Sequence, residues 1–162
     1  LAIERVLGEP MDGGAASQYM NRGTELEGQA FAWYGMEVDL PTERAPGVYV
    51  NDELGSACSP DGLVGDDGLV EIKCLGAKHH AAIMLDGIEA LYGEYRSQIQ
   101  GQMMLMGRAW NDLVAFHPSP NFRSIRSRFD RDAEFCDRLR VALAECNRLA
   151  SEFENDLRSQ AE

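Results

Sequence analysis

The chain has 162 residues, of which 44% are hydrophobic, so it is long enough for one compact domain with a core and too short for two. The formal net charge of -12 argues against a protein that coats nucleic acid over a broad surface, because such binding depends on neutralising phosphates. No apolar run approaches the roughly 18 residues of a membrane helix, and charged residues stand where a signal peptide would be apolar. We therefore expect one cytoplasmic domain, residues 1–162, that makes no membrane contact.

Two helices are predicted at the start of the chain. Residues 1–8 form the first, and the sequence GEPMDGG that follows would end it. Residues 16–35 form the second, because apolar residues recur there every three or four positions. Its buried stripe would consist of Leu26, Ala30 and Trp33. Glu27 would then lie beside that stripe, near the edge of the core.

The pattern changes to that of strands from residue 36 onward. The segments MEVDL (36–40) and VYVND (48–52) alternate apolar and polar residues, and prolines and a glycine separate them. Two more strands are expected at 56–64 and 68–74, joined by GDDG, a typical hairpin turn sequence.

Helices and strands follow one another again in the second half of the chain. The predicted elements are helices at 78–87 and 89–107, strands at 110–118 and 122–130, and a charged amphipathic helix at 131–160. The whole order predicts a mixed α/β or α+β domain with a central sheet.

The four cysteines are predicted to be reduced thiols, because they lack close CxxC pairing and no secretion signal accompanies them. Cys136 and Cys146 fall ten residues apart in one predicted helix, and therefore on roughly the same side. We expect both to be buried as small apolar groups.

Two acids and a base gather in the sequence SACSPDGLVGDDGLVEIKC. Asp61 and Glu71 flank its glycine-rich turn, and Lys73 follows Glu71 two residues later. In a β-strand Glu71 and Lys73 would share one face, while Val70 and Ile72 would enter the core. The charged groups would then lie beside one another.

This set suits metal-assisted hydrolysis of phosphodiester bonds. Two carboxylates on adjoining strands can coordinate one Mg²⁺, which prefers oxygen ligands and keeps several waters. Such an ion lowers the pKa of a bound water and neutralises charge that develops on phosphorus. Lys73 would position that water or stabilise the pentavalent phosphate. Taken alone, an acid-x-lysine triplet also occurs in ordinary solvated strands, so the motif by itself leaves that alternative open.

The pattern Pro-Asp, spacer, Glu-x-Lys resembles the active-site signature of the PD-(D/E)XK nuclease superfamily. The segments ACSPDGL, LVEIKC and YRSQIQGQMMLMGRAWNDLVAFHP look like the core of the phage lambda exonuclease and YqaJ-like viral recombinase family. RGTELEGQAF looks like that family's helix with a glycine and a glutamate. Together these segments cover roughly residues 15 to 120, in order and spacing. The resemblance implies a PD-(D/E)XK nuclease-like α/β core, with a central mixed β-sheet flanked by helices.

The resemblance also implies roles for individual residues. Asp61 and Glu71 would be metal ligands, and the main-chain carbonyl of Ile72 would complete the inner sphere. Lys73 would be the catalytic lysine. Glu27 matches the helical acid that helps to hold the metal, and Gln98 matches the first residue of a Gln-x-Gln pair close to the active site. The implied cofactor is Mg²⁺, with Mn²⁺ as a possible substitute. A solvated helix face is the alternative for both Glu27 and Gln98.

The function that the resemblance implies is a deoxyribonuclease of phage or prophage origin. It would digest linear double-stranded DNA from its ends, 5′-to-3′, and leave single strands for recombination. A ring-shaped homotrimer and a single-strand annealing protein are the implied partners. Family members usually carry a preceding segment that contacts the 5′ phosphate, and we expect this chain to lack it. An endonuclease of the same superfamily and a non-catalytic DNA-binding or assembly subunit remain alternatives.

Basic side chains outside the motif are candidates for guiding DNA. Arg126 and Arg128 would share a face of the strand predicted at 122–130 and form a small positive strip, unless they are merely solvated. His79 would lie near the DNA path. Cys74, His79 and His80 lack a second ligand pair at a convincing spacing, so a zinc site is not predicted.

Overall fold

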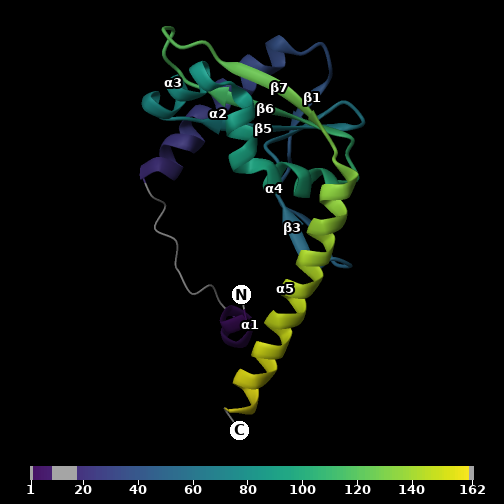
Figure 1. Ribbon diagram of the computed structural model, residues 1–162. Helices are drawn as coiled ribbons and strands as arrows, with labels where there is room; N and C mark the ends of the chain where they lie inside the picture. The colour runs from purple at the N-terminus through teal and green to yellow at the C-terminus, as the bar shows by residue number, and fades with distance from the viewer. Residues whose placement is uncertain (1, 9–17, 161–162) are drawn as a thin grey trace.

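The computed structural model describes residues 2–8 and 18–160 (Figure 1). The helices in these residues are α1 (Ala2–Leu7), α2 (Gln18–Glu37), α3 (Ala77–Asp86), α4 (Ile88–Met106) and α5 (Ala133–Ser159). The strands are β1 (Thr42–Arg44), β2 (Tyr49–Asn51), β3 (Ser56–Cys58), β4 (Gly62–Val64), β5 (Gly68–Cys74), β6 (Trp110–Phe116) and β7 (Ile125–Asp130).

Five of the strands form one mixed sheet in the order β1-β4-β5-β6-β7. β5 and β6 are parallel, because the chain crosses between them through α3 and α4, and the other neighbours pair antiparallel. β2 and β3 form a separate two-stranded sheet. The predicted central mixed sheet flanked by helices is confirmed.

The sheet is covered on both faces, and each face has its own apolar core. α2 covers one face, where Ala30 and Tyr34 pack against Val70, Ile72 and neighbouring apolar residues. α3 and α4 cover the other face, packing against Leu69 and Leu113 among others. The predicted burial of Val70 and Ile72 is confirmed. Glu71, on the α4 face, is itself only 3% exposed.

Two strand predictions are wrong. The segment 36–40 is not a strand, since α2 continues to Glu37 and β1 begins only at Thr42. Residues 56–64 are not one strand either. β3 pairs with β2, and Pro60, which has no N–H to donate, lies between β3 and β4.

Gly62 permits the close packing of the hairpin that follows Asp61. A Cβ at this position would lie 2.6 Å from the Phe31 ring and 2.9 Å from the Glu43 carbonyl oxygen. The predicted hairpin of β4 and β5 forms, with Gly62 opposite Val70 and the turn at residues 65–67.

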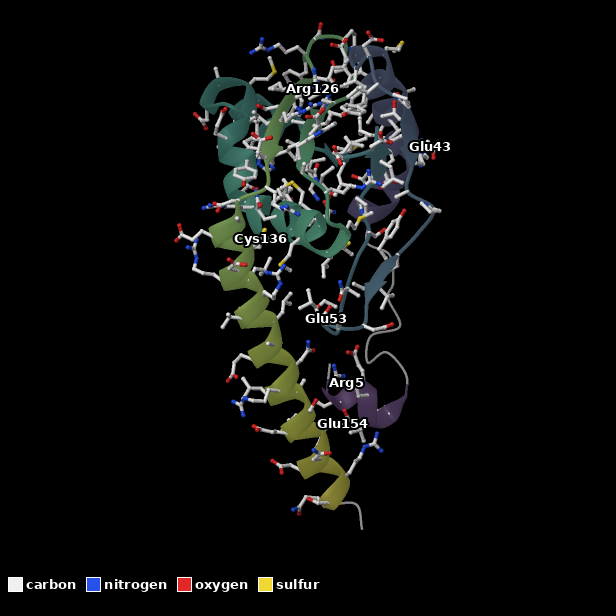
Figure 2. All side chains as sticks on the ribbon, turned by 90° about the vertical axis from the view of Figure 1, so that its right-hand side faces the viewer. Arg5, Glu43, Glu53, Arg126, Cys136 and Glu154 are labelled. Atoms are coloured by element: carbon white, nitrogen blue, oxygen red, sulfur yellow. The ribbon has the colours of Figure 1, made fainter. Side chains whose placement is uncertain are left out.

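α5 forms an arm that extends away from the sheet (Figure 1). The Asp132 side chain caps its first turn by accepting a hydrogen bond from the Phe135 N–H. α1 packs against the distal part of α5. Figure 2 shows Arg5 beside Glu154, to which it is paired at 3.9 Å. The β2–β3 hairpin is joined to the arm where Asn147 donates to the Leu54 carbonyl at 2.8 Å.

The four cysteines, all within the described residues, are reduced thiols, as predicted, but they differ in burial. Cys136 is buried where α5 meets α4, whereas Cys146 is exposed. The predicted burial of Cys146 is wrong, because α5 has already left the body of the protein at that position. Among the helices of the described residues, none combines the length and the apolar character needed to cross a lipid bilayer.

Candidate active site

Asp61 and Glu71 are brought together by the β4–β5 hairpin. Asp61 immediately precedes β4, and its Oδ2 accepts a hydrogen bond from the Ile72 N–H at 2.6 Å. Since this N–H belongs to the residue after Glu71, the two acids lie side by side at the same end of the hairpin. The structure therefore juxtaposes the two acids on which the motif depends.

Both oxygens of the Glu71 carboxylate accept hydrogen bonds. Oε1 accepts from Lys73 Nζ and from Gln98 Nε2, each at 2.7 Å. Oε2 accepts from Gln102 Nε2, also at 2.7 Å. Lys73 and Gln98 are thus gathered around Glu71, as the sequence predicts for neighbours of the site.

Lys73 is held in place by three groups. Besides Glu71 Oε1, its Nζ contacts Gln98 Oε1 at 3.2 Å and lies 4.1 Å from the centre of the Tyr95 ring. An ammonium over an aromatic face is stabilised by the ring's electrons. The Lys73 ammonium is therefore fixed at the entrance to the acid pair, with 18% of its side chain exposed.

The acid pair carries more negative charge than the protein neutralises. Burial, followed by the neighbouring Glu71 charge, raises the pKa of Asp61 to about 7, although the Ile72 N–H and Lys73 act in the opposite direction. Glu27 also contributes to raising this pKa. The Lys73 ammonium thus stands against the buried Glu71 and the partly buried Asp61, and a cation bound here would relieve the repulsion between the two acids.

Glu27 and Asp61 line a small cavity together with Phe31, Arg44 and Ile72. Arg44 was not singled out from the sequence. Its strand register, opposite Gly62, places it next to Asp61, and its guanidinium lies 5.3 Å from the Phe31 ring centre. Detecting it required knowing that β1 pairs with β4.

The acid pair fits a hard divalent cation such as Mg²⁺. Asp61 and Glu71 offer oxygen ligands, and their shared excess of negative charge is what such an ion neutralises. Within residues 2–8 and 18–160, no three His, Cys, Asp or Glu side chains converge on one point. Main-chain oxygens and water can complete a coordination sphere that two carboxylates begin, as Mg²⁺ allows. The ligand roles of Glu27 and of the Ile72 carbonyl stay predictions.

The glutamines of α4 that contact Glu71 are not the pair that the sequence predicted. Gln98 and Gln102, one helical turn apart, both point at Glu71. Gln100 lies on another side of the helix, where it binds Tyr92, the Asp130 carbonyl and the Asp132 N–H. Gln102 was missed, although its i, i+4 spacing from Gln98 was a readable signal.

Arg126 and Arg128 share a face of β7, as predicted, but they are engaged with a buried acid. Asp112 on β6 is completely buried and accepts from Arg126 at 3.1 Å and from Arg128 at 2.9 Å. Tyr34 donates to the same carboxylate at 2.7 Å. The proposed DNA contact of both arginines stays a prediction, and the structure adds a role in neutralising Asp112.

His79 lies at the surface of α3 with its Nε2 3.2 Å from Glu94 Oε1. Its predicted position near the DNA path is not tested by this contact.

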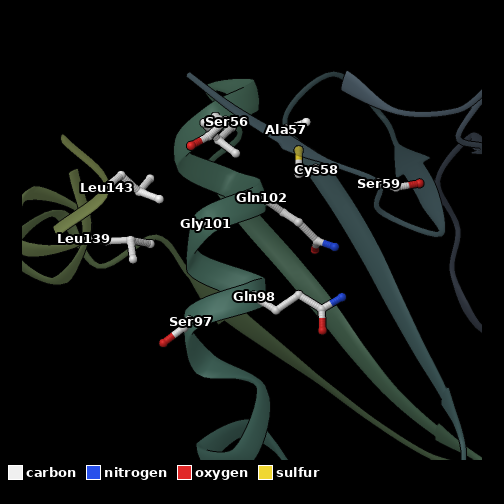
Figure 3. A pocket seen from close by; sticks show the side chains of 11 residues that line it. Ser56, Ala57, Cys58, Ser59, Ser97, Gln98, Gly101, Gln102, Leu139 and Leu143 are labelled. Carbon is white, nitrogen blue, oxygen red and sulfur yellow. The ribbon is translucent and has the colours of Figure 1, made fainter. Parts of the chain in front are cut away.

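A cavity of about 500 Å³ adjoins the glutamines that hold Glu71 (Figure 3). Gln98 and Gln102 form one wall, and Figure 3 shows Leu139 and Leu143 from α5 and Cys58 from β3 around it. Its volume lies within the roughly 300–1,000 Å³ of small-molecule sites.

Solved exonuclease structures resemble the whole described fold. The alkaline exonuclease LHK-Exo from Laribacter hongkongensis has a TM-score of 0.86 and 30% identity, over 99% of this chain and 80% of that one. Its complex with dAMP gives a TM-score of 0.84 at 30% identity over the same shares. A phage related exonuclease from Haemophilus somnus 129PT, at 19% identity over 99% and 80%, shares the fold with a TM-score of 0.63.

A comparison with curated protein sequences finds no match. Residues 3–109 match the YqaJ-like viral recombinase domain, which is about two thirds of the chain and includes the acids, Lys73 and the glutamines. This match confirms the resemblance on which the predicted nuclease core rests. The chain therefore belongs to the YqaJ-like viral recombinase family.

Proposed function

We propose that this phage-type DNA exonuclease cleaves with a divalent metal ion held by Asp61 and Glu71, and that Lys73 is its catalytic cation. One observation carries the proposal: the buried Glu71 and the partly buried Asp61 lie together, and a single ammonium, that of Lys73, is hydrogen-bonded to Glu71. A purely structural acid pair would be neutralised by the protein itself. This pair is left with a negative charge that a cation and a phosphate group can use.

The proposed ion is Mg²⁺, for which Mn²⁺ can substitute. When bound, it supplies a Lewis acid that lowers the pKa of a water and neutralises charge on the phosphate. Asp61 would contribute one carboxylate oxygen, and its deprotonation would accompany metal binding because ligands must be ionised. Glu71 would contribute another.

Lys73 would act on the substrate without touching the metal. Its ammonium is fixed by Glu71, Gln98 and the Tyr95 ring, and it carries three N–H donors. A non-bridging phosphate oxygen placed at this entrance would accept one of them. Such preorganised donors stabilise the charge that develops in the transition state.

The proposed substrate is the end of linear double-stranded DNA, degraded 5′-to-3′ to leave a single strand for recombination. The relative from Laribacter hongkongensis binds dAMP, a deoxynucleoside monophosphate. The cavity beside Gln98 and Gln102 has the volume and the mixed apolar and polar lining to receive such a product. Arg44, exposed and next to Asp61, is a suitable contact for a backbone phosphate.

The proposal also includes assembly as a homotrimer and interaction with a single-strand annealing protein. The arm formed by α5 supports the homotrimer, because its apolar side chains Val141, Leu149 and Phe153 are at least half exposed and would be covered by a second subunit. A ring would also reconcile the net charge of -12 with DNA, since only its lumen must be positive. Sedimentation of the protein at several concentrations measures this assembly directly.

The test is degradation of linear duplex DNA labelled at its 5′ or its 3′ end, with Mg²⁺ or with EDTA. Lys73→Ala should lower the rate by at least about 100-fold, because it removes the charge nearest the phosphate. It should leave Mg²⁺ binding intact, because Lys73 makes no bond to the ion. Lys78→Ala is the matched control, since Lys78 is the chain's other lysine and lies exposed on α3.

Three outcomes would contradict the proposal. Equal rates for the two lysine variants would remove Lys73 from the chemistry, and full activity in EDTA would remove the metal. Cutting of a covalently closed circular plasmid at the rate of the linear form would indicate an endonuclease instead.

A further inference from the structure

The direction of the Glu71 carboxylate depends on the hydrogen bonds that it accepts from the side chains of α4. Glu71 is 3% exposed, and it lies on the face of β5 that α4 covers. Its Oε2 accepts a hydrogen bond from Gln102 Nε2 at 2.7 Å. Each carboxylate oxygen has about two acceptor positions, so Oε2 retains one for a metal ion.

Gln102 is fixed in turn by a second buried amide. Its Oε1 accepts from Asn111 Nδ2 at 2.9 Å, and Asn111 is completely buried on β6, beside Leu69 of β5. The two amides and the carboxylate thus form one line of hydrogen bonds from β6 through α4 to β5.

The direction of this line is determined by the charge of Glu71. The ionised carboxylate only accepts, so Gln102 must turn its NH₂ group toward Glu71 and its oxygen toward Asn111. Asn111 must then present its own NH₂ group. Its Oδ1 is left buried without a hydrogen-bond partner among the described residues.

We propose that Gln102, supported by Asn111, is a positioning residue that orients Glu71 for the metal ion. It does so with a neutral donor, which adds no positive charge to compete with the ion. Gln98 and Lys73 hold the other oxygen, so Glu71 is fixed at both ends. This inference rests on the proposed function, since it concerns the same metal site.

The chain provides a matched control on the same helix. Gln100 is buried like Gln102, and its side chain also joins α4 to other elements, but it bonds to Tyr92, Asp130 and Asp132. Methionine has nearly the length of glutamine and no amide. Gln100→Met therefore removes at least as many hydrogen bonds as Gln102→Met, and only Gln102→Met removes a contact to Glu71.

The experiment is calorimetric titration of the full chain with Mg²⁺, with thermal unfolding of each metal-free variant. Both methionine variants should lower the unfolding temperature. Gln102→Met should raise the Kd for Mg²⁺ by about 10–100-fold, the range for residues that orient metal ligands. Gln100→Met should change that Kd by less than about twofold. In DNA cleavage, Gln102→Met should raise the Mg²⁺ concentration that gives the half-maximal rate.

Asn111→Ala provides a second variant that keeps the donor to Glu71 and removes only the support behind it. It should raise the Kd for Mg²⁺ by a few fold, and it decides the question if Gln102→Met fails to fold. Unchanged Mg²⁺ affinity in the folded variant, or equal changes for positions 100 and 102, would overturn the inference and leave the proposed function intact. Failure of the unmodified chain to bind Mg²⁺ would instead overturn both.

Discussion

Two buried acidic centres lie in the same sheet, and they are neutralised to different extents. Asp112 on β6, facing α2, receives hydrogen bonds from Tyr34, Arg126 and Arg128, so two cations surround one carboxylate. Asp61 and Glu71, by contrast, share the Lys73 ammonium, and the further cation beside them, Arg44, lines a cavity with Asp61 and a third acid, Glu27. The first centre has an excess of positive partners and the second a deficit.

The pKa values of the two aspartates follow this difference. Burial alone would raise the pKa of Asp112, but hydrogen bonds from Arg128 and Tyr34 hold it below its usual value. Burial and the Glu71 charge raise the pKa of Asp61 instead. A buried acid therefore indicates function only when its partners are counted: Asp112 stabilises the fold, whereas Asp61 is left with an unmet requirement for a cation.

The largest effect that would separate the two centres is expected from Asp61→Asn. It should lower the cleavage rate about 10³-fold or more and abolish Mg²⁺ binding, because the lost ligand accounts for several kcal/mol of charge stabilisation. DNA end release and calorimetry measure the two effects. The control is Asp66→Asn in the exposed turn between β4 and β5, which should leave both unchanged. Unaltered Mg²⁺ affinity in Asp61→Asn would contradict the assignment.

Asp112→Asn should have the opposite profile. It should lower the free energy of unfolding by about 3 kcal/mol, because it removes a buried charge that three side chains address. Urea denaturation measures this change. Cleavage per folded molecule should be retained. The nearby, exposed Asp130→Asn is the control, for which the change should stay below about 0.5 kcal/mol. Loss of cleavage in a folded Asp112→Asn protein would show that Asp112 also serves catalysis and would contradict the distinction between the two centres.

The stability of the metal-free protein should depend on pH in two opposite ways. Asp61 has a pKa raised from 3.8 to about 7, so between these values the folded state binds more protons, and stability falls as pH rises. Asp112 has a lowered pKa, so its stabilising contribution is present above about pH 4 and is lost in acid. We expect the unfolding temperature to fall by about 5 °C from pH 4.5 to 7.5. This slope should flatten in Asp61→Asn or with saturating Mg²⁺, and a slope unchanged in both would exclude Asp61 as its source.

The smallest effect is expected from Arg126→Ala. Because Arg128 remains on Asp112 and the Arg126 side chain is 32% exposed, the unfolding free energy should fall by only about 1 kcal/mol. If its charge serves Asp112 alone, the affinity for duplex DNA should change less than about twofold in a fluorescence titration. A larger loss that disappears at high salt would support the DNA contact predicted from the sequence.

Periodicity and short motifs predicted most of the fold. The helices at 78–87 and 89–107 and the hairpin joined by GDDG lie within a residue or two of α3, α4 and β4–β5. The segment 36–40 was wrongly predicted as a strand, because apolar and polar residues alternate across the end of α2 and the residues that follow it. The residue at which a helix ends is difficult to predict from such a pattern.

The candidate site was predictable as far as its local motif. Asp61, Glu71 and Lys73 are close in sequence, so a hairpin suffices to gather them. Gln102 and Arg44 depend on which face of α4 and which strand edge meet the hairpin, and short-range patterns carry no such information. Asp112 was hidden for the same reason, since its partners Tyr34 and Arg128 come from α2 and β7.

The arm offers a place to attach a label. Cys146 is exposed on α5, whereas Cys136 is buried and the Cys58 thiol has a pKa raised by burial, which slows its reaction with maleimides. A dye at Cys146 would sit on an extension of the molecule, away from the hairpin that carries Asp61 and Glu71 (Figure 1). Because Cys146 precedes Leu149 and Phe153 by three and seven residues, the dye would lie on the side of α5 that a second subunit would cover. Its fluorescence would therefore report assembly through the arm.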